Sequence, residues 1–556
     1  MDRGSVFYIA VGAALGVTTV YVARVLYDGR RRSEVEGDGS SPSLGSAHPA
    51  MAKYGGCIYL DYNATTPIWP EVSSVMRPYT LQCFGNPSSS HVFSAPCKEA
   101  VKVARRHVQY LVNASSPDTI YFTSCGTESD NRAIDIALHA YHAHKSKGDT
   151  HPPHVVTCAI EHPAVLVYLR MLESQEKITL TTLPVDDEGF VLPGEVQGAL
   201  TKRTALVSIM HSNNEVGTIQ PIQAIANVIK QYNARHMTTE KSGRRILLHC
   251  DAAQSLGKVT VDVDVLGVDM LTIVGHKFGA PKGVAALYVA NHDVYLRGGL
   301  AGSPLLVGGG QEHGARGGTE NVILIAALGE AARIARAEAV ATLFHLLRLK
   351  KRLIRALKSG SNEQGSTLSI RFNGPERSND DEEISSDLSL LLMILKQPSS
   401  RAPGVSSNGH SSNGDSRVVA EDWMKFSETC KYEDGEDEGE ERKRPAVFSA
   451  MSGTLVEQLP NTVSVSFRNV RTQQLMPLLQ SRVACSAGSA CHSEAASGDV
   501  LSPVLAAMRV PVEYGRGTLR LSFGRHTTEA EIDKAAAHIL ESAGLLMQGK
   551  AAARGR

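Results

Sequence analysis

The sequence predicts an α/β fold in which a doubly wound, mostly parallel sheet is accompanied by a second, smaller α/β unit. Apolar runs of strand length alternate with helical segments from about Thr119 to Ala335, the pattern of parallel strands joined by crossover helices. A second α/β unit begins near Leu343. At 556 residues the chain can bury a large core in two or more domains.

The N-terminal segment predicts a single membrane span. Residues 6–23 carry no charged side chain and are just long enough to cross a bilayer. More arginines follow this run than precede it, so the positive-inside rule leaves the rest of the protein facing the cytosol. We therefore expect an anchor over residues 1–32 and a flexible tether over residues 33–56. The mitochondrial outer membrane suits such an anchor. The alternative is an organellar presequence, with a soluble protein in the cytosol or in the mitochondrion after processing.

Five apolar runs of the first unit are each followed by polar side chains. The carboxyl ends of parallel strands meet at one edge of an open sheet, where ligands gather. We therefore expect the residues that follow these runs to form a site. The runs are Phe122–Thr123, which leads into a helix through Ala133 and Leu138, then Val155–Thr157, Leu206–Ile209, Ile246–Leu248 and Val268–Val274.

Two of these strand ends carry residues with strong chemistry. Lys277 directly follows His276 after the last run. An amine at the end of a buried strand is costly unless it is neutral or covalently engaged, and a Schiff base with pyridoxal phosphate meets that requirement. Asp251 follows the run Ile246–Leu248, and a carboxylate there can keep a pyridinium nitrogen protonated. The alternatives are a solvated turn for the lysine and a helix N-cap for the aspartate.

Three further segments suit the same cofactor. Gly126 and Thr127 open a helix, so free amides and the threonine hydroxyl can form a cradle for phosphate. His162 offers an imidazole that can stack on a flat ring, and Asn214 places an amide beyond another strand. Taken singly, these segments are also explained as a helix cap, a surface histidine and a turn.

Together the motifs resemble the class V, fold-type I pyridoxal phosphate enzymes of the cysteine desulfurase and selenocysteine lyase family. The matching motifs follow the family order from Tyr59–Pro67 to Leu519–Arg525. They cover nearly everything from about Cys57 to Leu546, apart from one insertion. The resemblance implies the fold of a type I pyridoxal phosphate-dependent transferase.

The resemblance also assigns cofactor contacts position by position. Lys277 would carry the cofactor, Asp251 would pair with the pyridine nitrogen, and His162 would stack on the ring. The other implied contacts are Gln254 at the phenolic oxygen, Asn214 beside the cofactor, Gly126, Thr127 and His276 at the phosphate, and Thr319 at the phosphate of the other subunit. The last contact implies a homodimer with two shared sites.

The nucleophile and the substrate contacts are implied by other motifs. Cys491 matches the catalytic cysteine that takes sulfur or selenium from the substrate, and its loop of small residues can swing a thiol toward a bound molecule. Cys485, in the strand-like run before that loop, is interpreted as a buried small hydrophobe. Arg520 matches the arginine that clamps the substrate carboxylate, and Asn63 is expected to contact the substrate.

The implied reaction is Schiff-base chemistry on an amino acid, in which Lys277 removes the α-proton, Cys491 accepts the chalcogen and L-alanine is released. Val274 stands where many cysteine desulfurases have a serine, so one phosphate hydroxyl is missing. This and the sequences around Lys277, Cys491 and Ser502–Leu505 favour a selenocysteine lyase. A cysteine desulfurase is the alternative, and a class V aminotransferase is a second one, although it would have no use for a thiol on a mobile loop. A selenium or sulfur acceptor protein is an expected partner.

Composition bears on nucleic acid binding and on the state of the cysteines. The 57 basic and 57 acidic residues balance, so nothing indicates a nucleic acid partner. The nine cysteines show no metal-like Cys-x-x-Cys spacing, and their odd number indicates reduced thiols.

The family pattern also divides the chain into domains. We expect a large cofactor-binding domain over residues 57–340, whose N-terminal segment can pack on the small domain. The small domain is expected over residues 341–375 and 456–548. Residues 376–455 contain a Ser/Asn/Gly tract and an acidic run, and they predict a disordered insertion, with a docking arm for a partner as the alternative.

Overall fold

A computed structural model describes residues 44–145, 148–237, 245–297, 302, 304–363, 368–375, 457–487 and 501–554. The predicted membrane span, the insertion at 376–455 and Cys491 lie outside these ranges. Those interpretations and the domain boundaries therefore stay predictions. Within the described ranges, no helix combines the length and the apolar character needed to cross a bilayer.

The large sheet has seven strands in the described part of the chain, in the order β2-β8-β7-β6-β5-β3-β4. The five strands from β7 to β4 are parallel, whereas β8 runs antiparallel to both of its neighbours. The strands are β2 (Ile120–Thr123), β3 (His154–Cys158), β4 (Thr179–Leu183), β5 (Thr204–Ser208), β6 (Leu247–Asp251), β7 (Met270–Val274) and β8 (Ala285–Val289). The predicted mostly parallel sheet is thus confirmed.

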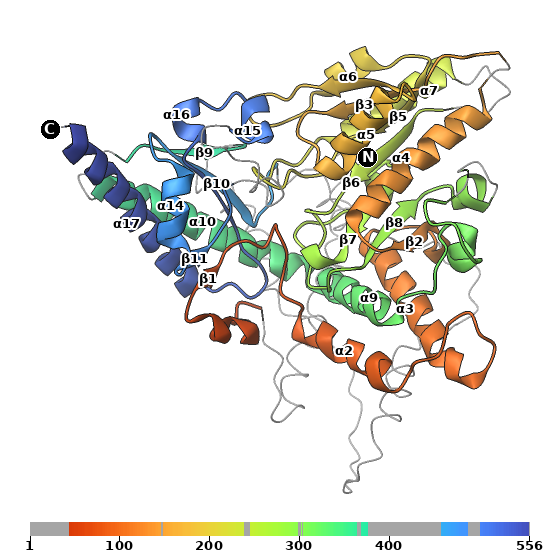
Figure 1. Cartoon of the computed structure of the whole chain (residues 1–556), viewed down its shortest axis with the longest axis horizontal. Helices are drawn as coiled ribbons and strands as arrows, with labels where there is room; N and C mark the ends of the chain where they lie inside the picture. The colour runs from red at the N-terminus through yellow and green to blue at the C-terminus, as the bar shows by residue number, and fades with distance from the viewer. Residues whose placement is uncertain are drawn as a thin grey trace, which may run out of the picture. The chain divides into compact units, whose positions relative to one another are not determined.

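Helices cover both faces of this sheet, because successive strand residues point to opposite sides. In β6, Leu247 packs with the face of α4 and α5, and Leu248 packs with the face of α3, α7 and α9. On the second face α2, α3 and α9 lie side by side (Figure 1). The prediction of a doubly wound sheet is therefore also confirmed. The helices are α2 (Pro70–Leu81), α3 (Ala95–Leu111), α4 (Gly126–Ala143), α5 (Pro163–Ser174), α6 (Pro193–Ala199), α7 (Ile222–His236), α8 (Val263–Leu266) and α9 (Val322–Ala337).

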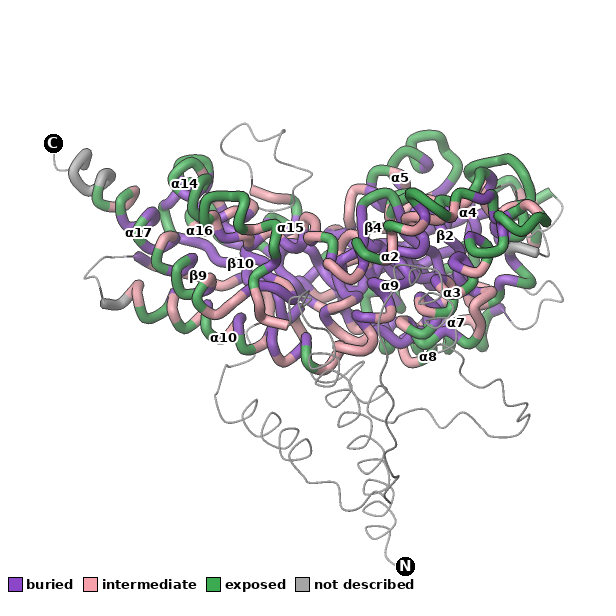
Figure 2. The backbone as a smooth tube through the Cα atoms, turned by 90° about the horizontal axis from the view of Figure 1, so that it is seen from below, coloured by how far each residue is buried: buried purple, intermediate pink, exposed green. Residues whose placement is uncertain are grey.

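A smaller α/β unit is built on the antiparallel sheet β12-β10-β9. Its strand β10 is fully buried, whereas the helices that pack around it expose their outer sides (Figure 2). A short parallel pair joins β1, from the start of the described chain, to β11. The elements are β1 (Ile58–Tyr59), α10 (Ala339–Glu363), β9 (Ile370–Asn373), β10 (Thr462–Phe467), α14 (Thr472–Leu479), β11 (Val483–Ala484), α15 (Pro503–Ala507), α16 (Val512–Gly515), β12 (Thr518–Ser522) and α17 (Glu529–Arg554).

The segment after β1 connects the small sheet to the end of β7. The Asn63 amide donates to Ser522 Oγ on β12 at 2.9 Å, and the Thr66 amide donates to the His276 carbonyl at 2.9 Å. Farther along, the ring of Trp69 covers Gly279, where a Cβ atom would lie 2.2 Å from the ring at a φ of +87°. This close approach requires glycine, and it fixes the segment beside Lys277.

Candidate active site

Lys277 and Asp251 lie at the carboxyl ends of neighbouring parallel strands. β6 ends at Asp251, and Lys277 lies in the 3-10 turn η4 (Gly275–Lys277) directly after β7. Lys277 Nζ donates to the backbone carbonyls of Asn63 at 2.6 Å and Ala64 at 3.1 Å. The half-buried amine is thus held by neutral acceptors at the edge of the sheet where the sequence predicted a site.

The carboxylate of Asp251 is buried, with 7% of the residue exposed. Its Oδ1 accepts the Ala253 amide at 2.9 Å, the type of bond that the capping interpretation requires. Burial raises the pKa of Asp251, while His162 and Lys277 act in the opposite direction. A protonated ring nitrogen would give this carboxylate a cationic partner, so the bond to Ala253 and the cofactor role are compatible.

Two further acids lie near Asp251. Burial and the charge of Asp251 raise the pKa of Glu161 to about 8 and raise the pKa of Asp130 well above its ordinary value. Glu161 Oε1 accepts the Met210 amide at 2.5 Å, and Asp130 Oδ1 lies 3.7 Å from His249 Nε2. Glu161, with a pKa of about 8, is mostly neutral near pH 7, and the raised pKa of Asp130 disfavours its charged form. His162 and Lys277 favour the charged form of Asp251, which is therefore the member of the group best suited to carry charge. Sequence reasoning missed Asp130, since it lies inside a helix rather than at a strand end.

His162 and the first turn of α4 border the same region. His162 is the N-cap residue of α5, where its Nδ1 accepts the Ala164 amide at 3.2 Å. Gly126 opens α4 against Val274, and a Cβ atom at this glycine would lie 2.7 Å from Val274 Cγ2. Thr127 is exposed. Glycine is therefore required for the first turn of α4 to pack this closely on the end of β7. The free amides of such a turn are suited to bind an anion.

The other predicted phosphate contacts are His276, in η4 after β7, and Thr319. Burial and nearby lysines lower the pKa of His276 to about 4, so its imidazole is neutral at pH 7. Its Nδ1 lies 3.1 Å from Thr65 Oγ1. Thr319 is exposed and lines a cavity together with Ser124, which precedes α4.

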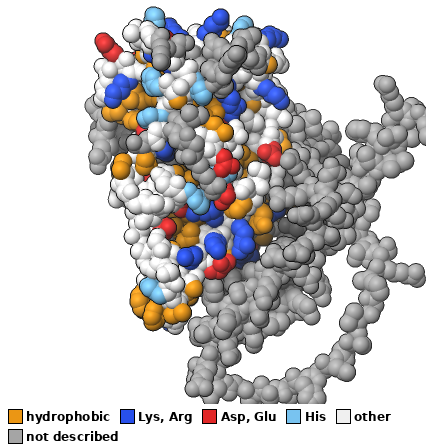
Figure 3. Space-filling model, turned by 90° about the vertical axis from the view of Figure 1, so that its right-hand side faces the viewer, with side chains coloured by type: hydrophobic (Ala, Val, Ile, Leu, Met, Phe, Trp, Pro, Cys, Tyr) orange, Lys and Arg blue, Asp and Glu red, His pale blue; other side chains and the backbone are white. Residues whose placement is uncertain are grey.

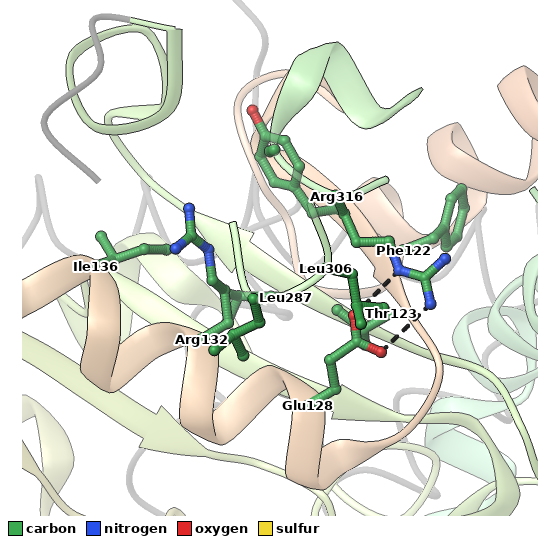
Figure 4. Close-up of a pocket in the computed structure, with 11 residues that line it drawn as sticks. Phe122, Thr123, Glu128, Arg132, Ile136, Leu287, Leu306 and Arg316 are labelled. Atoms are coloured by element: carbon green, nitrogen blue, oxygen red, sulfur yellow. Dashed lines mark hydrogen bonds and ion pairs between the residues drawn. The ribbon is translucent and has the colours of Figure 1, made fainter. Parts of the chain in front are cut away.

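An ion pair fixes the segment that carries Thr319 against the first turn of α4. Arg316 donates from Nε to Glu128 at 3.1 Å, and Figure 4 shows this pair across a cavity that Phe122 also lines. Glu128 in turn accepts the Ser124 amide at 2.7 Å. The two motifs are thereby held together, although the role of Thr319 at a second subunit stays a prediction.

Arg520 lies on β12 with only 2% of the residue exposed. Its Nη2 lies 2.6 Å from Asp61 Oδ1, and its Nη1 donates to the Asn214 carbonyl at 3.2 Å. Sequence reasoning named Arg520 and Asn214 but not Asp61, although Asp61 belongs to the motif Tyr59–Pro67. The carboxylate partner shows that this position already accommodates an anion beside the guanidinium.

Asn63 is buried, with 1% of the residue exposed, and its side chain connects several segments through hydrogen bonds. Its Nδ2 donates to the Asn214 carbonyl at 3.2 Å and to Thr462 Oγ1 at 2.9 Å. Its Oδ1 accepts from Lys258 at 3.2 Å and from Asn461 at 3.1 Å. The side chain therefore ties the large sheet to β10, and its predicted contact with substrate stays a prediction.

Gln254 lies against Asn63 and brings in a second lysine. Its Nε2 donates to the Asn63 carbonyl at 3.0 Å, and its Oε1 accepts from Lys258 Nζ at 3.0 Å. Sequence reasoning missed Lys258, which is 6% exposed. Its spacing of four residues from Gln254 was the available signal, because such residues share a face in a helical turn.

The two C-terminal cysteines differ in what the structure describes. Cys491 lies outside the described residues, so its assignment comes from its motif alone. Cys485 is 8% exposed, and burial raises its pKa to about 12. A thiol that stays protonated at neutral pH is a poor nucleophile, which confirms its interpretation as a buried small hydrophobe.

These parts fit pyridoxal phosphate. An amine and a carboxylate stand at adjacent strand ends, and the first turn of α4 packs on Val274 with free amides that would bind a phosphate. Arg520 would supply a cation for a substrate carboxylate. The fold and the site together define a pyridoxal phosphate-dependent enzyme that acts on amino acids or similar carboxylates.

Comparison with known proteins identifies the family. The profile of the family described as Aminotransferase class-V matches residues 58–367 and 447–535. A cysteine desulfurase IscS of Dictyoglomus turgidum is 33% identical over 477 residues, which are 86% of this chain and 92% of that protein. A selenocysteine lyase of Bos taurus is 33% identical over 491 residues, 86% of this chain and 91% of its own. The chain belongs to the class-V aminotransferase family, in its cysteine desulfurase and selenocysteine lyase group.

Solved structures agree with this assignment. A NifS-like protein, 27% identical, aligns with a TM-score of 0.62 over 88% of this chain and 100% of its own. SspA in complex with cysteine, 26% identical, aligns with a TM-score of 0.56 over 85% of this chain and 100% of its own. The expected type I fold and the dependence on pyridoxal phosphate are confirmed.

Proposed function

We propose that the protein is a cysteine desulfurase, which converts L-cysteine to L-alanine and leaves the sulfur on Cys491. The observation that carries the proposal is a short chain of hydrogen bonds that connects Lys277 to Arg520 through Asn63 and the Asn214 carbonyl. Lys277 Nζ binds the Asn63 carbonyl, the Asn63 side chain binds the Asn214 carbonyl, and Arg520 binds that same carbonyl. A small amino acid can therefore place its carboxylate at Arg520 and its α-carbon near Lys277.

Sulfur is favoured over selenium by the relatives rather than by the residues. The sequence alone favoured a selenocysteine lyase, but the relatives of similar identity include cysteine desulfurases of bacteria and archaea, and SspA was solved with cysteine. The bovine selenocysteine lyase, at the same 33% identity, keeps L-selenocysteine as a second candidate substrate.

Three of the described residues, Arg520, Lys277 and Asp251, have different roles in the proposed reaction. Arg520 orients the α-carboxylate with its fork of N–H donors. Lys277 accepts the α-proton at Nζ and can return it, since its neighbours at this atom include two neutral carbonyls. When bound, pyridoxal phosphate supplies an electron sink that weakens the bonds at the α- and β-carbons of the substrate. Asp251 sustains that sink by stabilising positive charge at the ring nitrogen.

The sulfur transfer step balances without an external oxidant. The Cys491 thiolate attacks the sulfur of the substrate, so a new S–S bond forms while the bond between Cβ and sulfur breaks. The electron pair of the broken bond remains with the carbon fragment, whose β-carbon takes up a proton. The products are L-alanine and a persulfide on Cys491, which a sulfur acceptor protein can then receive.

One purified preparation tests the substrate. Alanine release is measured from L-cysteine and from L-selenocysteine under reducing conditions, in the wild type and in Cys491→Ala. The proposal expects turnover of L-cysteine that depends on Cys491. Turnover of L-selenocysteine alone would replace the proposed desulfurase with a selenocysteine lyase, and release of a keto acid product instead of alanine would indicate an aminotransferase.

We also propose that the enzyme is a homodimer. The loop between α2 and α3 exposes Phe84 and Phe93, at 77% and 61%, with their rings stacked at 5.8 Å. Figure 3, which views the molecule from the side of this loop, shows a hydrophobic patch at the lower end of the face. Such a patch favours burial against a second copy, as the motif around Thr319 implies. Light scattering of the wild type and of Phe84→Ser/Phe93→Ser tests this, and a wild-type monomer that binds the cofactor fully would contradict it.

A further inference from the structure

We propose that Lys258 is a positioning residue of the cofactor site, which holds the Gln254 carboxamide with its NH2 group turned toward the phenolic oxygen of pyridoxal phosphate. The inference rests on the proposed function, and on the contact between Gln254 and that oxygen that the family resemblance implies. It adds the residue that orients the contact.

The burial of Lys258 calls for a reason. Only 6% of the residue is exposed, and both hydrogen-bond acceptors of its Nζ are neutral amide oxygens, on Gln254 and on Asn63. Burial, together with the charges of Lys277 and Arg520, moves the pKa of Lys258 well below its ordinary value. An apolar side chain would fill this position at lower cost, so the N–H donors of the amine are what the site gains.

The donors of Lys258 determine how the carboxamide of Gln254 is turned. A carboxamide offers an acceptor at one end and two donors at the other, and the Lys258 amine donates from Nζ to both of its amide neighbours. Gln254 Oε1 therefore faces Lys258, at 3.0 Å. Nε2 must then face the opposite way, and there it donates to the Asn63 carbonyl at 3.0 Å.

The orientation matters because Nε2 then lies beside the cofactor-bearing lysine. The Asn63 carbonyl that receives Nε2 also receives Lys277 Nζ, at 2.6 Å. The phenolic oxygen of the cofactor lies close to the carbon that Lys277 attaches to, and this oxygen is an acceptor. With the amide reversed, two oxygens would oppose each other. Lys258 disfavours that arrangement without touching the cofactor, because it acts through its hydrogen bond to Gln254 Oε1.

A purely structural role for Lys258 is the competing explanation. Its second bond, to Asn63 Oδ1, supports the junction between the large sheet and β10. Loss of that bond would lower the stability of the whole protein without a specific effect on the cofactor. The two explanations differ in whether the effect of Lys258 passes through Gln254.

A double-mutant cycle separates them. The cofactor-free forms of wild type, Lys258→Met, Gln254→Met and the double variant are titrated with pyridoxal phosphate, and the visible band of each loaded form is recorded. We expect Lys258→Met to raise the dissociation constant about 10-fold, the effect of one lost hydrogen bond to a charged group. We also expect its visible band to move to longer wavelength, because the phenolic oxygen loses its donor.

The cycle gives a decisive pattern. If Lys258 acts through Gln254, then Lys258→Met in the Gln254→Met background changes the dissociation constant less than about 2-fold. The proposal would be overturned if the two substitutions changed the dissociation constant by independent factors that multiply in the double variant. It would also be overturned if Lys258→Met had the same visible band as the wild type. Thermal unfolding of the cofactor-free forms measures the structural contribution separately.

A second variant covers the case in which Lys258→Met does not fold. Gln254→Glu keeps an acceptor for Lys258 and removes the N–H donor, so it should bind the cofactor as weakly as Gln254→Met. Wild-type affinity in Gln254→Glu would show that no oriented donor is needed. Because these readouts involve no substrate, they stay informative if the wild type fails to release alanine from L-cysteine.

Discussion

Arg520→Lys should separate substrate binding from chemistry. The substitution keeps the positive charge next to Asp61, so this half-buried carboxylate stays paired. It replaces a planar fork of five N–H donors by a single nitrogen with three. In the wild type, the two terminal nitrogens each donate one bond, Nη2 to Asp61 at 2.6 Å and Nη1 to the Asn214 carbonyl at 3.2 Å. A lysine that pairs with Asp61 cannot also present two parallel donors to a substrate carboxylate.

The expected magnitude follows from one lost charge-assisted bond. Such a bond contributes about 1.5 to 3 kcal/mol, which corresponds to a fall in kcat/KM of about 10- to 150-fold. Since the carboxylate is bound equally in the ground state and the transition state, the fall should come from KM, with little change in kcat. The assay is alanine release from L-cysteine over a range of substrate concentrations.

Arg525→Lys is a matched control. Arg525 is also buried, at 7% exposure, and it forms ion pairs with Glu71 at 3.0 Å and Glu338 at 2.7 Å. This substitution should lower thermal stability to a similar degree and leave KM for cysteine unchanged. An equal rise of KM in both variants, or an unchanged KM in Arg520→Lys, would refute the role given to Arg520.

Three further predictions use single substitutions. Lys277→Ala should lose the visible band of the lysine-bound cofactor and all turnover, whereas exposed Lys282→Ala keeps both; an active Lys277→Ala protein would contradict the cofactor assignment. Cys491→Ala should abolish turnover of L-cysteine, and Cys485→Ala should leave it near normal, because burial raises the pKa of Cys485 to about 12. Burial lowers the pKa of Lys350 to about 7. Between about pH 7 and pH 10 the unfolded chain therefore binds more protons at this lysine than the folded chain does. The free energy of unfolding should consequently rise with pH in this window. Urea unfolding at both ends of this window should show a smaller rise in Lys350→Met, and an equal rise would exclude this lysine as its source.

The strands of the large sheet could be predicted because each is a short apolar run buried on both faces. The runs Ile246–Leu248 and Val268–Val274 became β6 and β7, and the polar residues after them lie at the edge where ligands bind. The antiparallel direction of β8 was not foreseen, because the apolar pattern of a strand buried on both faces does not depend on its direction in the sheet. The pairing of β1 with β11 joins segments more than 400 residues apart, which no local pattern reveals.

The site could be predicted at strand ends and motifs but not in the contacts between them. Lys277 and Asp251 were found because a polar group after an apolar run is costly without a partner. Asp61 was missed as the partner of Arg520, since their ion pair joins two distant motifs. Asp130 and Lys258 were missed because their meaning depends on which group each one faces, and that is set by tertiary packing.

The missed residues reveal how charge is divided across the site. Asp251 raises the pKa of Asp130 and of Glu161 on one side, and the basic side chains of Lys258, Lys277 and Arg520 influence one another on the other. A ring that carries positive charge at its nitrogen and negative charge at its phenolic oxygen is matched by this division, and so is a substrate that presents a carboxylate to the cationic side. The raised pKa values of Asp130 and Glu161 disfavour further negative charge on the acidic side, beyond what one ring nitrogen could balance. The arrangement would therefore orient the ring before substrate arrives, which is the kind of electrostatic preorganisation that lowers barriers without cost during the reaction.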